Sequence, residues 1–104
     1  MMEARLFFGN QIAAGGMVSA AQWQEFVDTE VTPRFPDGFS VLTTTGQWRR
    51  PDGAVARETG HELVILFAPA AATGQKLAGI RAAYKQQFMQ DSVLLAESPA
   101  CAGF

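Results

Sequence analysis

The stretch that decides the fold reads Glu30-Val31-Thr32-Pro33-Arg34-Phe35-Pro36-Asp37-Gly38-Phe39-Ser40-Val41-Leu42. Pro33 disfavours helical geometry in the residue before it, so a helix that enters this stretch is expected to end near Thr32. Beyond the two prolines, residues 39–50 are rich in Val, Thr and aromatic side chains, a composition that favours a strand. The stretch therefore ends a helix, crosses a loop and begins a strand.

The helix before this stretch has a clear start. Ser19 is followed three residues later by Gln22, which predicts a capping box in which each side chain satisfies a free backbone N–H. Val18 before the cap and Trp23 at the fourth helical position are placed to form a hydrophobic staple. The apolar residues that follow recur at helical spacing and predict one buried face: Trp23, Phe26, Val27 and Val31.

The strand after this stretch is the first strand of a predicted hairpin. Pro51-Asp52-Gly53 is a turn sequence, in which proline presets φ and glycine accepts positive φ. Residues 54–68 then return as the long second strand of the hairpin, with Gly60 as a candidate bulge. A short apolar run that is ended by Gly9-Asn10 predicts another strand, at residues 3–9.

The remaining elements complete one domain, residues 1–104. A second helix is predicted over residues 71–89 from an apolar stripe of Leu77, Ile80, Tyr84 and Phe88, and a last strand from Ser92 to Glu97. The order strand, helix, strand, strand, helix, strand is the split βαβ pattern. We therefore expect a ferredoxin-like α+β fold, a four-stranded antiparallel sheet with two helices on one face.

The strands are apolar on both faces, although two helices can cover only one. Leu63, Ile65 and Phe67 alternate with Val64 and Leu66, and such unbroken apolar runs usually mean burial on both faces. We expect a homodimer or higher homo-oligomer through the open sheet face, a dimeric α+β barrel. The alternative is that the tail from Pro99 to Phe104 folds over part of that face.

Composition excludes several classes of protein. The net charge is −2 and the only adjacent basic pair is Arg49-Arg50, so no nucleic-acid partner is expected. No apolar stretch is long enough to span a membrane. The single cysteine, Cys101, allows neither an internal disulfide nor a cysteine-based zinc site, and no cofactor motif is present. We expect no cofactor and no metal.

The start of the chain bears on its location. Residues 1–5 lack the charged-then-apolar pattern of a signal peptide. As written, the chain is expected to be cytoplasmic, and it would be an exported protein if a leader had been removed.

Nearly the whole chain resembles the DUF3574 family, bacterial proteins without an assigned activity. The residues that carry the resemblance include Phe7-Phe8-Gly9, the run from Glu30 to Phe39, Gly46-Gln47-Trp48-Arg49, the strand around Ile65 and the helix from Ile80 to Phe88. The resemblance implies a fold and no catalytic residues.

Four residues are candidates for binding or chemistry, and the first three have a structural alternative. Arg34, between two prolines, could anchor an anion through its guanidinium, or instead pair with Glu30 or Asp37 or stack on Phe35. Trp48 could stack on a ligand, or instead pack in the core or at a subunit contact. His61, the only histidine, is the default acid or base and a candidate catalytic residue, and its alternative is a partly exposed strand histidine. Because it alternates with the same set as Arg57 and Ile65, His61 is expected to approach the open face, where Arg57 is a further ligand contact.

Three functions remain open on the sequence alone. The first is a small-molecule-binding ferredoxin-like oligomer with a pocket between the sheet and its partner. The second is a cofactor-free acid–base enzyme of the barrel type, with His61 as the general base. The third is a structural or protein-interaction module whose apolar face joins other chains.

Overall fold

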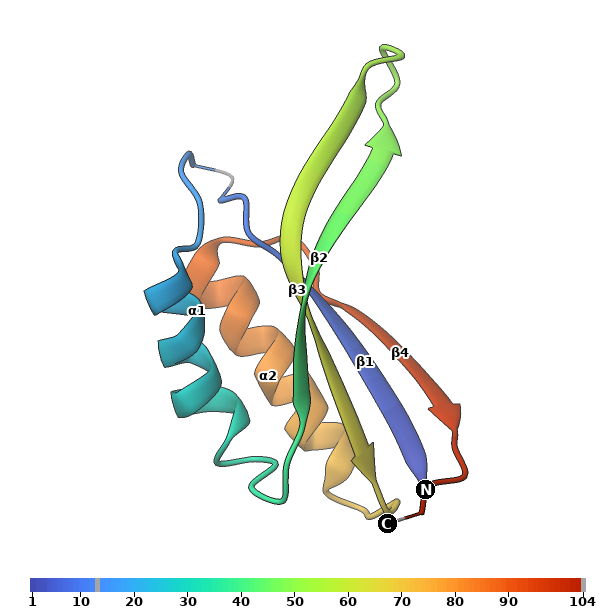
Figure 1. Ribbon diagram of the computed structural model, residues 1–104. Helices are drawn as coiled ribbons and strands as arrows, with labels where there is room; N and C mark the ends of the chain where they lie inside the picture. The colour runs from blue at the N-terminus through green and yellow to red at the C-terminus, as the bar shows by residue number, and fades with distance from the viewer. Residues whose placement is uncertain (13, 104) are drawn as a thin grey trace.

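The computed structural model describes residues 1–12 and 14–103 and contains the six predicted elements in the predicted order (Figure 1). The strands are β1 (Met2–Gly9), β2 (Ser40–Arg49), β3 (Val55–Phe67) and β4 (Leu94–Pro99). The helices are α1 (Ala20–Phe26), extended by the π-helical turn η1 (Val27–Val31), and α2 (Thr73–Phe88).

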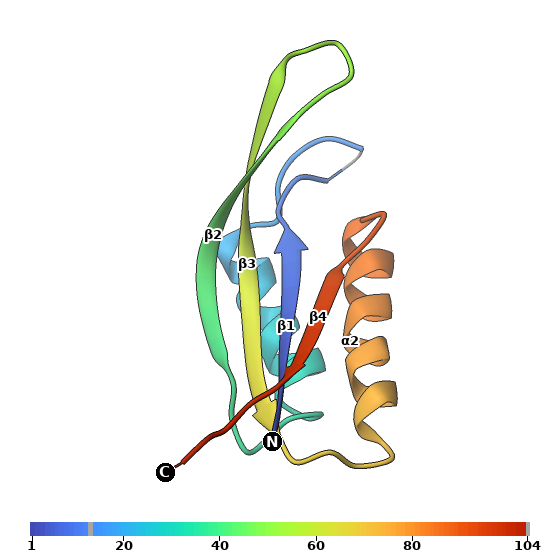
Figure 2. The same cartoon turned by 90° about the vertical axis from the view of Figure 1, so that its right-hand side faces the viewer.

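All strand pairs are antiparallel, and the order across the sheet is β2-β3-β1-β4. Both helices lie against one face, and both chain ends lie at the lower end of the sheet (Figure 1). The other face carries no helix (Figure 2). We call this second face the open face. The ferredoxin-like α+β fold predicted from the element order is confirmed.

The helix start, the helix end and the hairpin turn lie where the sequence predicts them. The Ser19 side chain accepts from the backbone N–H of Gln22, whose side chain accepts from the N–H of Ser19. The helical segment ends where Pro33 follows, with the Thr32 N–H donating to the carbonyl of Val27. Gly53 has a φ of 89° in the hairpin turn. The bulge expected at Gly60 is wrong, because β3 keeps an uninterrupted register with both of its neighbours.

The core lies between the helices and the inner face of the sheet. Alternate residues of β1 and β3 point into it, and both helices contribute their predicted apolar faces. An aromatic cluster forms its centre, with the rings of Phe8 and Tyr84 4.8 Å apart and those of Phe26 and Tyr84 5.0 Å apart.

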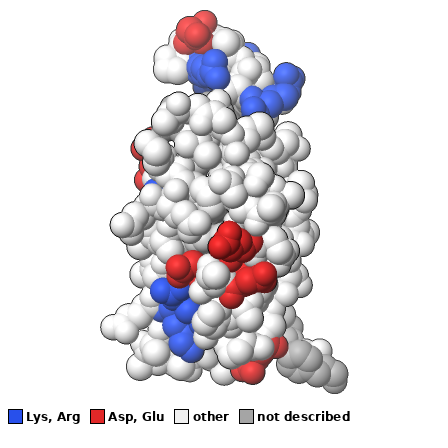
Figure 3. Space-filling model, turned by 90° about the vertical axis from the view of Figure 1, so that its left-hand side faces the viewer, with Lys and Arg blue, Asp and Glu red and all other residues white. Residues whose placement is uncertain are grey.

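The hairpin of β2 and β3 projects beyond the rest of the sheet (Figure 1). β1 pairs with β3 only as far as Gly60, so residues 46–49 and 55–58 pair only with each other. We call this projecting part the arm. On the helix-covered side of the molecule, charged side chains gather at the arm's tip and in the lower half, with a largely uncharged area between them (Figure 3).

The tail does not shield the open face in the part described. The Ala100 N–H donates to the carbonyl of Met1, which prolongs the pairing of β4 with β1. Residues 101–103 are exposed and leave the sheet at its lower end (Figure 2). The centre of the open face therefore stays uncovered.

Candidate functional site

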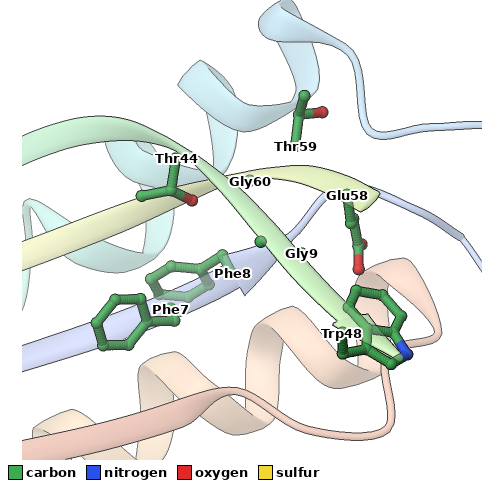
Figure 4. Close-up of a pocket in the computed structure, with 9 residues that line it drawn as sticks. Phe7, Phe8, Gly9, Thr44, Trp48, Glu58, Thr59 and Gly60 are labelled. Carbon is green, nitrogen blue, oxygen red and sulfur yellow. The ribbon is translucent and has the colours of Figure 1, made fainter. Parts of the chain in front are cut away.

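A hollow lies on the open face where β1 ends and the arm begins (Figure 4). Its volume is about 160 Å³. Its walls come from β1, β2 and β3, which bring together residues far apart in the sequence. They are Phe7, Phe8, Gly9, Thr44, Gly46, Trp48, Glu58, Thr59 and Gly60. We call this space the upper hollow. It unites Phe7-Phe8-Gly9 with Gly46-Gln47-Trp48, two of the pieces that carry the family resemblance.

Glycines form the floor of the upper hollow. Gly9 lies directly opposite Gly60, and Gly46 lies opposite Glu58. A methyl group on Gly60 would collide with the carbonyl oxygen of Phe8, and one on Gly9 would come within 2.5 Å of Glu58 Oε1. The absence of side chains at these two positions therefore lets the strands and the carboxylate approach closely, and it opens space above the sheet.

Glu58 places a carboxylate in the upper hollow. Its side chain is directed into the space between Gly9 and Trp48 (Figure 4). Oε1 accepts a hydrogen bond of 2.8 Å from the backbone N–H of Gln11. Within residues 1–12 and 14–103, no lysine or arginine forms a salt bridge with it. The carboxylate is thus held in place without a counter-charge from the described part of the chain.

Tyr84 supports the floor from below. Its hydroxyl donates a 2.6 Å hydrogen bond to the carbonyl of Gly9. Burial, and then the negative charge of Glu58, raise the pKa of Tyr84 well above its ordinary value. The hydroxyl therefore stays protonated and fixes the end of β1 against α2.

Two aromatic side chains border the upper hollow. Trp48 is 48% exposed, and Phe7 is half-buried. Figure 4 shows their rings on either side of Gly9, with the Glu58 side chain near Trp48. The upper hollow therefore offers aromatic surface, a carboxylate and bare backbone. Of the four residues predicted from the sequence, Trp48 is the one that lines it.

Arg34 lies at the opposite end of the molecule, in the loop after η1. Its Nη1 donates to the carbonyl of Glu30 at 2.8 Å and to Glu30 Oε2 at 2.7 Å. A methyl group on Gly79 of α2 would lie 2.9 Å from its Nε and Nη2, so the guanidinium packs close to bare helix backbone. Arg34 and Lys76 line a second hollow of about 450 Å³ near Phe35 and Phe67. The pairing with Glu30, the structural alternative, is present.

His61 faces the helices, and the expectation that it approaches the open face is wrong. Its ring stacks on Trp23 of α1 with centroids 4.2 Å apart and planes 4° apart. Burial lowers the pKa of His61, and its Nδ1 is buried without a hydrogen-bond partner in the described structure. His61 does share a face of β3 with Ile65, as predicted, but that face points into the core.

Arg57 also lies away from the upper hollow. It is opposite Gln47 in the arm, and its Nε donates to Gln47 Oε1 at 2.9 Å. It lines a separate hollow of about 400 Å³ beside Met17, in the loop between β1 and α1. The four predicted residues therefore fall in four different places, and the structure does not bring them together.

Sequence reasoning missed Glu58, Thr44 and the glycine floor as site residues. A signal was available in the hairpin. Counting outward from the turn centred on Asp52 pairs Trp48 with Ala56 and Gly46 with Glu58, which is the observed register. Side chains directly opposite in an antiparallel pair share a face, so this count places the carboxylate beside Trp48.

Two further observations concern metal binding and membrane-spanning helices. Among the described residues, no group of three or more His, Cys, Asp or Glu side chains is arranged to hold a metal ion. Neither helix in the described ranges combines the length and apolar character that a membrane crossing requires.

The sequence profile of the family described as "Protein of unknown function (DUF3574)" matches residues 3–104. The chain belongs to the DUF3574 family. No curated protein sequence matches it. The family membership inferred from the sequence is thus confirmed over nearly the whole chain, and it brings no assigned activity.

Solved structures similar to this DUF3574 protein share its fold. A phage SAM lyase in complex with S-methyl-5'-thioadenosine has a TM-score of 0.66 at 16% identity, over 93% of this chain and 79% of that chain. The same type of lyase in the apo state gives 0.68 at 15%, over 93% and 78%. The periplasmic divalent cation tolerance protein CutA from Archaeoglobus fulgidus gives 0.62 at 10%, over 100% and 88%. At these identities the likeness shows the fold alone.

Proposed function

We propose that this DUF3574 protein is a small-molecule-binding homo-oligomer, with its ligand held in the upper hollow between the open face and a second copy. The observation that supports this most strongly is an apolar open face that continues into a hollow with a carboxylate and two aromatic side chains.

The open face is too apolar for a surface in permanent contact with water. Leu94 is 62% exposed, Leu42 is 46% exposed and Leu66 is 44% exposed, and they come from three different strands. Phe7 lies between Leu94 and Glu62 in one row across the sheet, and Leu42 follows. Large apolar side chains exposed on several strands of one sheet face are typical of a protein contact.

The charges at the centre of this face favour an identical partner. Glu62, which is 7% exposed, accepts from Arg5 Nε at 2.8 Å. The pair neutralises itself within one chain, so two copies can meet face to face without bringing unpaired central charges together. A two-fold contact uses the same patch twice, which suits a face of this kind. We therefore take a second copy as the occupant.

The upper hollow is small for a complete binding site. Its volume of about 160 Å³ is below the range of about 300–1,000 Å³ of typical small-molecule pockets. A second copy on the open face would add the missing wall and exclude water. The hollow is then half of a pocket, and the site is incomplete without the partner copy.

The position of His61 supports binding over acid–base catalysis at this place. The imidazole lies against Trp23 on the helix side of the sheet, away from the upper hollow. The titratable group that lines the hollow is Glu58. We therefore assign the upper hollow a binding role, in which Trp48 and Glu58 contact the ligand.

The test is native mass spectrometry of the purified protein, with Leu94→Lys and Met89→Lys as matched variants. The leucine and the methionine are both more than half exposed, at 62% and 56%, but Met89 lies at the end of α2, outside the upper hollow. We expect the wild type to be a dimer or higher oligomer with retained small-molecule mass. Leu94→Lys should shift it toward monomers without that mass, and Met89→Lys should not. A wild-type protein that is monomeric at micromolar concentration would refute the proposal.

A further inference from the structure

We propose that the ligand of the upper hollow is an organic ammonium ion, whose charged head lies between Glu58 and Trp48. This inference rests on the proposed function and adds the chemical class of the ligand. It follows from what happens to Glu58 when the open face is covered.

The Glu58 carboxylate is oriented before any ligand arrives. The Gln11 N–H fixes Oε1 at 2.8 Å, and the missing side chain at Gly9 lets the carboxylate fold close to the end of β1. Oε2 has no hydrogen-bond donor from the described part of the chain. One carboxylate oxygen is therefore anchored and the other is available to a ligand.

Covering the open face would remove water from the free Oε2 of Glu58, and this loss of hydration costs free energy. Glu58 is half-buried already, and a second copy would remove the remaining water. A carboxylate buried without a counter-charge loses more hydration than a single backbone hydrogen bond returns. None of the residues that line the upper hollow is a lysine or an arginine. A positive charge that enters with the ligand would therefore stabilise the closed site.

The aromatic border selects the same class of ligand. The face of a tryptophan ring attracts cations, and organic ammonium groups bind well to such a face. The Trp48 ring lies beside the Glu58 side chain (Figure 4), so a cation between them would lie near both. Phe7 lies at the other end of the glycine floor, and its ring already has the Arg5 guanidinium over it, 5.2 Å from the ring centroid. The volume of about 160 Å³ accommodates a head group, with the rest of the ligand against the second copy.

The experiment compares three probes of similar size and different charge. They are 2-phenylethylamine as the cation, 2-phenylethanol as the neutral analogue and 3-phenylpropanoate as the anion. Binding to the wild-type oligomer is measured by calorimetry, and the site is located by the amide NMR signals of Gly9, Gly46 and Gly60. We expect the amine to bind about tenfold more tightly than the alcohol, and the carboxylate to bind least.

Two variants assign this preference to named side chains. Glu58→Gln retains an oxygen for the Gln11 N–H and removes the charge, so it should abolish the preference for the amine over the alcohol. Trp48→Leu should weaken the amine while the protein stays folded and oligomeric. Glu97→Gln is the matched control, because Glu97 is exposed on β4 outside the upper hollow. It should leave all three affinities unchanged.

The outcomes separate the two proposals. Equal binding of amine and alcohol, unaltered by Glu58→Gln, would overturn the ammonium inference and leave the proposed binding role standing. If no probe shifts the three glycine signals, the binding role itself loses its support. If no amine binds but Glu58→Gln changes the oligomeric state, the counter-charge comes from a side chain of the second copy, and the ammonium inference is overturned.

Discussion

Gly9 and Gly60 lie directly opposite each other across β1 and β3, at the point where the four-stranded sheet gives way to the arm. The backbone of Phe8 approaches Gly60 so closely that a side chain there would collide with its carbonyl oxygen. The pair therefore serves two purposes. It permits the close approach of the strands, and it forms the floor of the upper hollow.

Gly60→Ala should destabilise the protein. The added methyl group meets backbone, which cannot rotate away, so the strands must shift. We expect a loss of about 1–3 kcal/mol in the free energy of unfolding, the usual cost of overpacking. Urea denaturation at fixed protein concentration measures it. The control is Gly74→Ala in α2, where nothing lies within 4 Å of the new methyl group. That variant should be neutral or slightly more stable, since alanine favours helix. Equal stability of both variants would refute the steric argument.

Tyr84→Phe tests the support under the same glycine. The variant keeps the buried ring and removes the 2.6 Å hydrogen bond from the hydroxyl to the Gly9 carbonyl. Loss of a buried partner costs about 1–3 kcal/mol, and we expect a lower melting temperature accordingly. Faster amide hydrogen exchange at Asn10 and Gln11 should accompany it, because the end of β1 loses its tie to α2. An unchanged melting temperature would mean that the Gly9 carbonyl finds another donor.

The fold could be predicted from the sequence because its signals are local. The capping box at Ser19, the proline at residue 33 and the turn at Gly53 each fix a boundary by backbone chemistry, and all three appear as expected. Alternation then identified which strand residues share a face. The bulge assigned to Gly60 failed because glycine has a second use in strands, the close approach of a neighbouring backbone.

The site could be predicted only in part, because alternation does not say which face is the inner one. Both faces of β3 are apolar, so the pattern placed His61 on the same face as Ile65 but did not indicate that this face packs against the helices. Trp48 was predicted as a ligand contact from its chemistry, and it lines the upper hollow. Glu58 was not, because its importance depends on the register of the arm and on Gly9, which is distant in sequence.

The pair Arg5–Glu62 should show strong coupling in a double-mutant cycle. Arg5→Gln leaves the nearly buried Glu62 carboxylate without its counter-charge and should lower stability. Adding Glu62→Gln removes the unpaired charge, so the double variant should be more stable than Arg5→Gln alone. Urea denaturation of the four proteins gives the coupling energy. Additive effects of the two substitutions would show that the pair contributes nothing beyond its separate side chains. Glu30→Gln, at the more exposed pair with Arg34, provides a comparison and should have a smaller effect.

The stack of His61 on Trp23 predicts how stability depends on pH. Burial lowers the pKa of His61 in the folded chain, so near the usual histidine value of about 6.5 the unfolded chain binds the proton more readily. The stabilising contribution of neutral His61 is therefore complete above about pH 6.5. It declines as the pH falls from there through the lower pKa of the folded state.

His61→Phe isolates this contribution, because phenylalanine keeps a flat ring beside Trp23 and has no proton to bind. The difference in unfolding free energy between the wild type and His61→Phe should shift in favour of the variant as the pH is lowered from 8 to 5. Because the carboxylates titrate in both proteins, their contribution to the pH dependence cancels in this difference. The chain has one histidine, so a single set of imidazole NMR signals reports the folded pKa directly. A folded pKa at or above about 6.5 would contradict the desolvation by which the structure accounts for the shift.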